Sequence, residues 1–312
     1  MRLFHLFFVL FTILIFSRCI DDSSGECPVG IDKNFILKFR YVSDGPEELF
    51  IEKIKRVDVF VFKEDGQYVM TQSANLAALT SFAGIMLDLD PGSYRIVCWG
   101  NASGKTFFSP LSTNSMMKDA FVTHTALRSG IAATNGDTLY YALDHTVLSP
   151  SLKVTTVSET VIERILDFHN AFIKIQVYVK GLSDKGPQGQ LLAPIVEMTG
   201  VTSGYNFEMQ TFGNAVHYLD ISAFEYISGE KVAAITFYTL RFQDDNPIEI
   251  KIKKSSDGST LTVINLKDFM KENNITVEGI EKAVVPILVE YKEASVEISI
   301  PEWGQIPVDP EL

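Results

Sequence analysis

Four residues in the stretch YRIVCWGNASGKTFFSP, residues 94–110, follow the order of a phosphate-binding loop: Gly100, Gly104, Lys105 and Thr106. In such a loop, backbone N–H groups surround the phosphates of a nucleotide, and the lysine and the hydroxyl complete the site. The pattern needs four residues between the first glycine and Gly-Lys-Thr, whereas three stand here, and the following FFSP does not begin an amphipathic helix. The sequence therefore predicts a strand that ends in a turn, and no nucleotide site.

Other residues with catalytic potential are scattered. The histidines beyond the N-terminal segment, His124, His145, His169 and His217, include no pair at metal-ligand spacing. The chain has no G-x-S-x-G motif, and none of its many carboxylates form a pair that indicates glycoside chemistry. We therefore predict no catalytic residue, no cofactor, no metal and no enzymatic activity. The aromatic side chains of Tyr140, Tyr141 and Tyr205 could stack on sugars, but in strands such rings more often pack on neighbouring strands.

The N-terminal segment MRLFHLFFVLFTILIFSRC predicts export. It has one arginine near its start and a mostly apolar run from Leu6 to Phe16, which is too short to span a bilayer but suits a secretory signal. We assign residues 1–18 to a lipoprotein signal peptide and residues 19–34 to a tether. An exported chain is also separated from ATP, which argues further against a nucleotide ligand.

Cys19 is the predicted lipidation site, because it stands at the first position after the signal peptide. Its sulfur would take a diacylglyceryl group and its freed amine another chain, and each buried methylene contributes roughly 0.8 kcal/mol to anchoring. The alternative is an ordinary cleaved signal, since Arg18 is a poor residue before a lipidated cysteine. Asp21 and Asp22 resemble the surface-export signal of Bacteroidales lipoproteins, so the expected location is the cell outer membrane, lipid-anchored and surface-exposed.

The net charge limits which molecules the protein can bind, and the remaining cysteines allow one disulfide. Without residues 1–18, which contain Arg2 and Arg18, the chain has 25 basic against 39 acidic residues and a net charge of −14. An acidic surface disfavours nucleic acid and anionic membranes as partners. With Cys19 acylated, Cys27 and Cys98 remain, either as a disulfide or with Cys98 as a buried free thiol in an apolar strand.

Alternating apolar residues predict an all-β protein. Period-two patterns occur in FILKFRY, FIKIQVYVK, PIEIKIKK and ASVEISI, the last with Val296, Ile298 and Ile300 inward, while VDVFVF is apolar on both faces and predicts a central strand. Turn residues such as Glu64-Asp65-Gly66 and Ser256-Asp257-Gly258 separate these strands. Helical patterns are few, one in NLKDFMKENN and a second candidate in TNSMMKDAFVTHTAL. Length suggests two domains, at about 100–200 residues each, which we place at residues 35–150 and 159–312.

Several segments together resemble the fimbrillin-associated (minor fimbrium) anchor subunit family of the Bacteroidales. Besides Cys19, they are, in chain order, FILKFRY, VDVFVFKEDGQYV, LDPGSYRIVCWGN, LYYA, IKIQVYVKG, VTSGYNF, FYTLRF and ASVEISIPEW. The resemblance implies two tandem transthyretin-like β-sandwich domains with a few short helices. It also implies an outer-membrane lipoprotein that anchors a type V fimbria, has fimbrillin subunits as partners and, in some members, limits fimbrial length.

The residues are compatible with the role that this resemblance implies. Fimbrial subunits associate by strand addition, in which a segment of one completes an open sheet of another. After Trp303 only GQIPVDPEL follows, in which Pro307 and Pro310 remove ladder donors, so we expect this chain to contact one neighbour by an exposed sheet edge, at residues that the sequence does not identify. Two alternatives stay open: a stalk or tip fimbrillin, and a surface glycan-binding lipoprotein.

Overall fold

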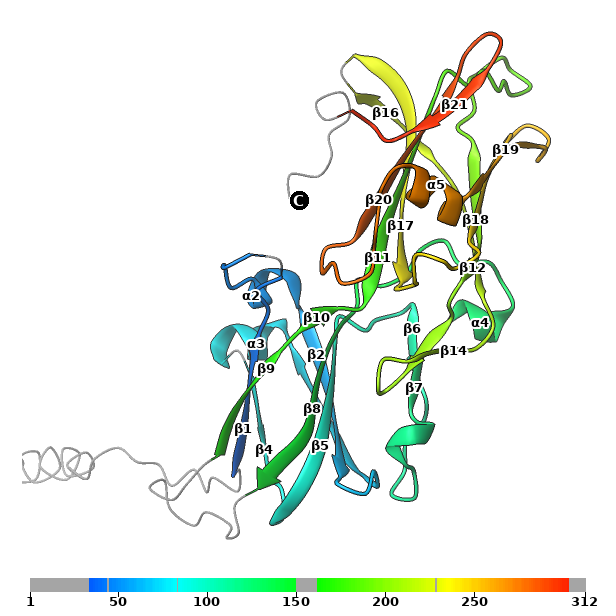
Figure 1. Ribbon diagram of the computed structural model, residues 1–312. Coiled ribbons are helices and arrows are strands. Elements are labelled where there is room, and N and C mark those ends of the chain that lie inside the picture. The colour runs from blue at the N-terminus through cyan, green and yellow to red at the C-terminus, as the bar shows by residue number, and fades with distance from the viewer. Residues whose placement is uncertain (1–33, 44, 83, 150–161, 228, 303–312) are drawn as a thin grey trace, which may run out of the picture.

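The computed structural model describes residues 34–43, 45–82, 84–149, 162–227 and 229–302, and these residues are mostly β-strands (Figure 1). Two sheets pack face to face in the lower half of Figure 1 and two more in the upper half. The predicted all-β class, with two tandem sandwiches and a few short helices, is confirmed. The predicted signal peptide and nearly all of the predicted tether lie outside the described residues.

The lower sandwich encloses one hydrophobic core between two sheets. Its β1 sheet has the order β4 (Gly84–Leu87), β1 (Phe35–Arg40) and β9 (Ile162–Asp167). Its β5 sheet has the order β10 (His169–Asn170), β8 (Tyr140–Ser149), β5 (Gly92–Gly100), β2 (Arg56–Lys63) and β3 (Tyr68–Asn75). Along β1, Phe35, Leu37 and Phe39 are buried and alternate with more exposed residues, as the period-two pattern predicts.

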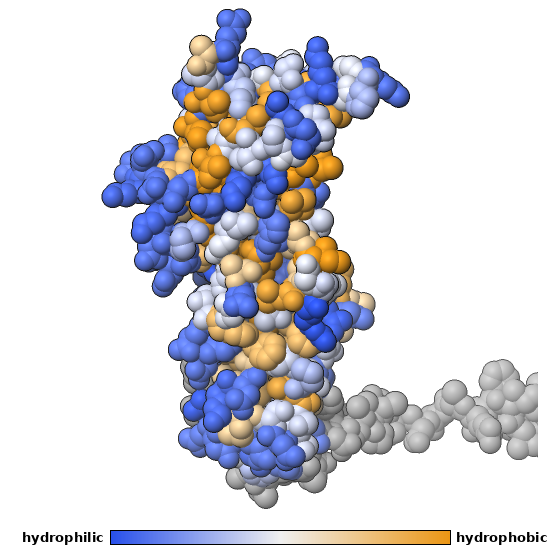
Figure 2. Space-filling view, turned by 90° about the vertical axis from the view of Figure 1, so that its right-hand side faces the viewer, coloured by the Kyte–Doolittle hydropathy of each residue, from blue (hydrophilic) through white to orange (hydrophobic). Residues whose placement is uncertain are grey.

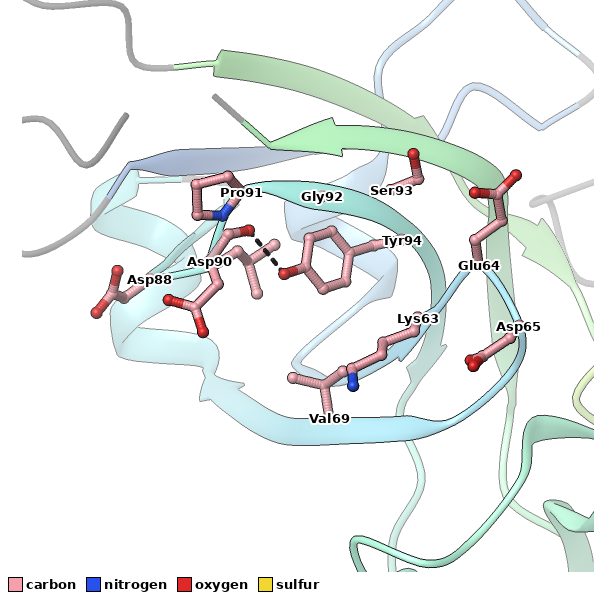
Figure 3. A pocket seen from close by; sticks show the side chains of 11 residues that line it. Lys63, Glu64, Asp65, Val69, Asp88, Asp90, Pro91, Gly92, Ser93 and Tyr94 are labelled. Carbon is pink, nitrogen blue, oxygen red and sulfur yellow. Dashed lines mark hydrogen bonds between the residues drawn. The ribbon is translucent and has the colours of Figure 1, made fainter. Parts of the chain in front are cut away.

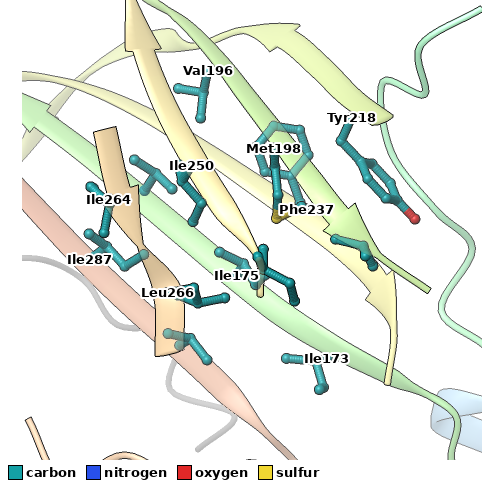
Figure 4. Packing of buried hydrophobic residues seen from close by; sticks show 14 of the residues in the cluster. Ile173, Ile175, Val196, Met198, Tyr218, Phe237, Ile250, Ile264, Leu266 and Ile287 are labelled. Carbon is teal, nitrogen blue, oxygen red and sulfur yellow. The ribbon is translucent and has the colours of Figure 1, made fainter. Parts of the chain in front are cut away.

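The upper sandwich is built in the same way. Its β11 sheet has the order β16 (Ala223–Ile227), β17 (Glu230–Leu240), β11 (Phe172–Lys180), β20 (Val284–Tyr291) and β21 (Val296–Ser299). Its β12 sheet has the order β15 (Val216–Ile221), β12 (Ile195–Val201), β18 (Glu249–Lys253) and β19 (Thr260–Asn265). Figure 4 shows side chains of the two sheets meeting in one core, with Ile175 and Phe237 from the β11 sheet near Met198 and Ile250 from the β12 sheet. Each fully buried aliphatic side chain in this core contributes about 1.5–3 kcal/mol to the free energy of folding.

A fifth sheet combines strands from distant parts of the sequence. Its order is β14 (Thr211–Phe212), β13 (Gly204–Asn206), β7 (Phe121–His124) and β6 (Thr106–Phe108). A separate core lies between this β7 sheet and the outer face of the β5 sheet, where Phe60, Trp99 and Phe207 are buried. Strand β2 is therefore covered on both faces, as its continuous apolar run predicts.

Strand pairing bears on where the two halves divide. Residues 162–167 form β9, which pairs in parallel with β1 from Phe35↔Ile162 to Arg40↔Asp167, and β10 pairs with β8. These strands complete the lower sandwich, although the sequence-based boundaries placed them in the second domain. We therefore propose that the division lies near Ala171, where β10 ends and β11 begins.

Helices and hairpins follow local sequence in most places. Helix α5 (Leu266–Glu272) occurs where NLKDFMKENN predicts it, and the Asn265 side chain caps it by accepting a hydrogen bond from the N–H of Asp268 at 3.1 Å. The second segment with a helical pattern, residues 113–127, holds only short helical pieces on either side of a strand. It contains a 3₁₀ turn (Met117–Asp119), strand β7 and the start of α4 (Ala126–Ser129), because pairing with β6 and β13 satisfies its backbone. The other short helices are α2 (Phe50–Lys53) and α3 (Leu76–Phe82).

Candidate binding surfaces and the attachment residue

The Gly-Lys-Thr turn binds a carboxylate of the chain itself. Asp137 accepts hydrogen bonds from the N–H of Ser103 at 3.0 Å, from the Ser103 hydroxyl at 2.6 Å and from the Thr106 hydroxyl at 2.6 Å. Strand β5 ends at Gly100 and β6 begins at Thr106, so no helix follows the turn. The predicted strand and turn are confirmed, and three donors of the turn, the Ser103 N–H and the hydroxyls of Ser103 and Thr106, are used inside the fold.

The histidines lie apart and serve different structural roles. His124 is buried, and its Nδ1 accepts a hydrogen bond from the N–H of Ala126 at 3.0 Å; burial lowers its pKa. The Nδ1 atom of His169 contacts a carboxylate oxygen of Glu281, and the Nε2 atom of His217 lies 2.9 Å from a carboxylate oxygen of Glu197. Across the described ranges, no group of three or more His, Cys, Asp or Glu side chains is placed to hold a metal ion. The side chain of His145 lies outside the described part of the chain.

The candidate sugar-stacking tyrosines pack within the protein. Tyr205 is buried and stacks on Trp99, with ring centroids 6.1 Å apart and an interplanar angle of 18°. Tyr140 is also buried, edge-on to Tyr41 at 4.9 Å, while Tyr141 is half-buried beside His169. The interpretation that these rings pack on neighbouring strands is confirmed for Tyr140 and Tyr205.

A pocket of about 700 Å³ lies at the lower end of the β5 sheet, beside the hairpin that joins β2 and β3 (Figure 3). Its wall includes the phenol of Tyr94, which donates a hydrogen bond to the carbonyl oxygen of Asp90 at 2.7 Å, and burial raises the pKa of Tyr94. Lys63 lies at the rim, together with four carboxylate side chains: Glu64, Asp65, Asp88 and Asp90. Asp88 and Asp90 have further partners in the chain.

Cys19, the predicted lipidation site, and Cys27 both lie outside the described residues. Cys98 is described, and it is a free thiol with no exposed surface, surrounded by the lower core. Burial raises the pKa of the Cys98 thiol, with a smaller contribution from the charge of Asp144. Of the two alternatives for Cys98, the structure has the buried free thiol.

One sheet edge of the upper sandwich exposes residues that the sequence predicts to face inward. Strand β21 pairs with β20 so that Ile298 lies opposite the buried Val289, and Val296 lies opposite Tyr291. Paired residues point to the same face of a sheet, so Val296 and Ile298 point to the core side. They nevertheless keep 44% and 37% of their surface exposed, because the four-stranded β12 sheet ends at β19 and does not cover β21.

We call this open region between strands β19 and β21 the β19–β21 seam. The hydroxyls of Thr262 on β19 and Tyr291 on β20 lie 2.7 Å apart and close its inner side. The alternation in ASVEISI predicts which residues face inward, but no local pattern predicts that the opposite sheet stops one strand short. The seam was therefore not identifiable from the sequence.

Figure 2 shows the side of the molecule that carries α4, β14 and β19. Hydrophobic residues form separate patches on its upper and middle parts, while the lower end is mostly hydrophilic. Exposed large hydrophobic residues on these elements and the adjoining loop are Leu127, Ile131, Phe212 and Val263. No helix among the described residues is long and apolar enough to cross a membrane.

These features define a class of protein. The described residues form two tandem β-sandwiches whose exposed strand edges can accept a further strand. The described histidine side chains and the Gly-Lys-Thr turn make contacts within the fold. The chain belongs to the family of fimbrillin-A associated anchor proteins Mfa1 and Mfa2, whose family model matches residues 23–308. The resemblance inferred from the sequence motifs is confirmed.

Solved structures show the same fold. The fimbrial anchor protein Mfa2 from Porphyromonas gingivalis matches 87% of this chain and 98% of its own, with a TM-score of 0.64 and 16% sequence identity. A proposed adhesin from Bacteroides ovatus matches 86% of this chain and 94% of its own, with a TM-score of 0.65 and 15% identity. A Bacteroides thetaiotaomicron protein, described as a proposed polysaccharide-binding protein, matches 87% of this chain and 99% of its own, with a TM-score of 0.64 and 14% identity. No curated protein sequence matches the chain significantly.

Proposed function

We propose that this protein is a non-enzymatic outer-membrane lipoprotein that holds a type V fimbria to the cell surface. Lipid on Cys19 attaches the chain to the membrane, and residues 19–34 connect the lipid to the lower sandwich. Membership of the anchor family across residues 23–308 supports the fimbrial role. The sixteen residues of the tether reach at most about 50 Å, so the lower sandwich stays near the membrane surface.

The arrangement of the two sandwiches suits an anchor. Strand β1, which follows the tether, begins at the lower end of the molecule, whereas β16, β19 and β21 lie in the upper half (Figure 1). A chain attached through residue 19 would therefore present the upper sandwich away from the membrane. We infer that the fimbrillin neighbour contacts this upper half.

The exposed row of Val296 and Ile298 is the observation that carries this contact. A strand from a neighbouring fimbrillin, added at the β19–β21 seam, would cover both side chains and use main-chain groups at the sheet edge. Strand β21 pairs with β20 without a register shift, so its outer edge is regular over Val296–Ser299. Burying most of the exposed part of these two aliphatic side chains would contribute about 1–2 kcal/mol to the free energy of binding, in addition to the backbone hydrogen bonds.

Two sets of variants test the proposal in cells that assemble the fimbria. A Cys19→Ala variant is expected to release both the chain and its fimbriae into the medium. An Ile298→Lys variant is expected to stay in the membrane fraction but to lose fimbriae, because a charge on the core side of the seam opposes burial of an added strand. Val263→Lys is the matched control, since Val263 is also exposed on an edge strand, β19, but its side chain points outward.

The outcomes separate the two parts of the proposal. Retention of Cys19→Ala in the membrane would exclude lipid attachment at that residue. Equal loss of fimbriae in the Ile298→Lys and Val263→Lys variants would exclude the seam as the contact. A mature chain cut after Arg40 or Arg56, detected by intact-mass spectrometry, would indicate a stalk fimbrillin in place of an anchor.

A further inference from the structure

A second cavity, separate from the β19–β21 seam, lies where the two sandwiches meet. Its volume is about 220 Å³, and its lining comes from both halves of the chain, including α2, β8, β11 and β17. Ligand pockets for drug-sized molecules span about 300–1,000 Å³, so this cavity suits a single ring-sized ligand. We call it the junction pocket.

Four aromatic rings form a continuous row along the junction pocket. Tyr41 lies edge-on to Tyr140 at 4.9 Å, Tyr140 to Phe172 at 5.7 Å, and Phe172 to Tyr238 at 5.6 Å. Each ring pair is close to perpendicular, with interplanar angles of 73°, 82° and 75°. Such a row fixes the rings and gives the pocket a rigid apolar wall.

Three lysines line the same pocket in a chain that is otherwise acidic. Lys53 comes from α2, Lys174 from β11, and Lys282 precedes β20, and the pocket has one carboxylate, that of Glu52. The chain has 39 acidic and 27 basic residues, so three lysines against one acid reverse its overall charge balance. The lysines have other partners within the protein, but an ammonium donates three hydrogen bonds and can share them with a ligand.

We propose that the junction pocket binds a sugar acid, meaning one pyranose ring that carries a carboxylate. The lysines attract the carboxylate, the half-buried rings of Phe172 and Tyr238 offer surface to the apolar side of the sugar ring, and Glu52 and the Thr138 hydroxyl bind sugar hydroxyls. Glu52 repels an anion in proportion to its charge, so it disfavours a small multiply charged anion more than a single carboxylate. This binding site is independent of the anchoring role proposed above.

Calorimetric titration of the full chain tests the proposal, with D-glucuronate as the probe. Glucose, which has the same ring without the carboxylate, is expected to bind at least about tenfold more weakly. The Lys174→Ala/Lys282→Ala double variant is expected to lose about tenfold in affinity for glucuronate, whereas the Lys251→Ala/Lys267→Ala control, with lysines outside the pocket, is expected to bind normally. Tyr238→Leu keeps all three lysines and is also expected to weaken binding, because the aromatic wall is interrupted. Thermal unfolding of each variant shows that it remains folded.

Three results would each overturn the proposal. The first is no detectable binding of glucuronate, and the second is equal binding of glucose. The third is inorganic phosphate binding as tightly as glucuronate, which would indicate a general anion site.

Discussion

The imidazole Nδ1 of His169 lies 2.7 Å from a carboxylate oxygen of Glu281, which joins the lower sandwich to the loop before β20 in the upper one. The second carboxylate oxygen of Glu281 accepts a hydrogen bond from the N–H of Asn170 at 2.8 Å. The hydrogen bond to Glu281 raises the pKa of His169, although burial opposes this shift. Burial opposes ionisation of Glu281, but the hydrogen bonds from His169 and Asn170 outweigh it and lower its pKa.

We predict that this pair makes stability depend on pH. A raised pKa of His169 means that its contribution is present below the unfolded value of 6.5 and is lost as pH rises through the folded value. A lowered pKa of Glu281 means that its contribution is present above 4.5 and is lost as pH falls through the folded value. The pair therefore stabilises the junction most between pH 4.5 and 6.5.

Thermal unfolding at pH 6 and pH 8.5 measures the effect. The decrease in Tm from pH 6 to pH 8.5 should be larger in the unmodified chain than in His169→Gln. The difference should be on the order of 1–2 °C, which is small because the pair is half-exposed. Glu281→Gln should reduce the decrease to the same extent, and the double variant should behave like either single one. An unchanged pH dependence in His169→Gln would show that other groups control it.

The phenol of Tyr205 supplies a second test of the junction. Its hydroxyl lies 3.2 Å from the carbonyl oxygen of Ala171 and accepts a hydrogen bond from the N–H of Arg241. Tyr205→Phe should lower the free energy of unfolding by about 1–2 kcal/mol, since it removes these bonds in a buried place. The matched control is Tyr226→Phe, because Tyr226 is 78% exposed and should change stability little. Equal stability of the two variants in denaturant titrations would contradict the structural role of Tyr205.

Gly136 lies where the chain has no room for a side chain. A Cβ atom at this position would be 2.3 Å from the carbonyl oxygen of Tyr238, and the neighbouring Asn135 is held by hydrogen bonds to Thr236 and Tyr238. Gly136→Ala should therefore lower the free energy of unfolding by about 2–3 kcal/mol, because the loop must separate from β17. Gly104→Ala, with nothing within 4 Å of its Cβ position, should be nearly neutral. Similar unfolding midpoints for the two variants would rule out this close approach.

Cys98 should be unreactive in the folded protein. Because burial raises its thiol pKa and removes access, a maleimide added at about pH 8 should label Cys98 only after denaturation. Mass spectrometry of peptides from native and unfolded samples measures the labelled fraction. Rapid labelling of Cys98 in the native protein would show that the β5 sheet opens readily.

Local sequence predicts many of the individual strands correctly. The alternation of Ile173, Ile175 and Val177 identifies β11 and its buried face, and the apolar run of VDVFVF identifies β2 as a strand covered on both sides. Asn265 and the spacing of the apolar residues after it identify α5. These predictions succeed because backbone geometry sets the period of side chains along a strand or helix, whatever the rest of the chain does.

Pairing between distant segments is beyond such patterns. A strand's own residues do not specify its neighbour, so nothing in residues 162–167 identifies β9 as the parallel partner of β1. The same reason explains why residues 113–127 form β7 beside β13, although their spacing allows a helix. Tertiary hydrogen bonds and shared cores outweigh weak local propensity.

The sequence by itself determined an all-β chain, the positions of its main strands, the absence of a complete phosphate-loop pattern and the motifs of the anchor family. Tertiary structure alone decided that Val296 and Ile298 stay exposed at the β19–β21 seam, and that Lys53, Lys174 and Lys282 share one pocket. The physical reason is that exposure and charge convergence depend on where sheets end and which faces meet. Those relations arise between segments far apart in the chain, and no local period encodes them.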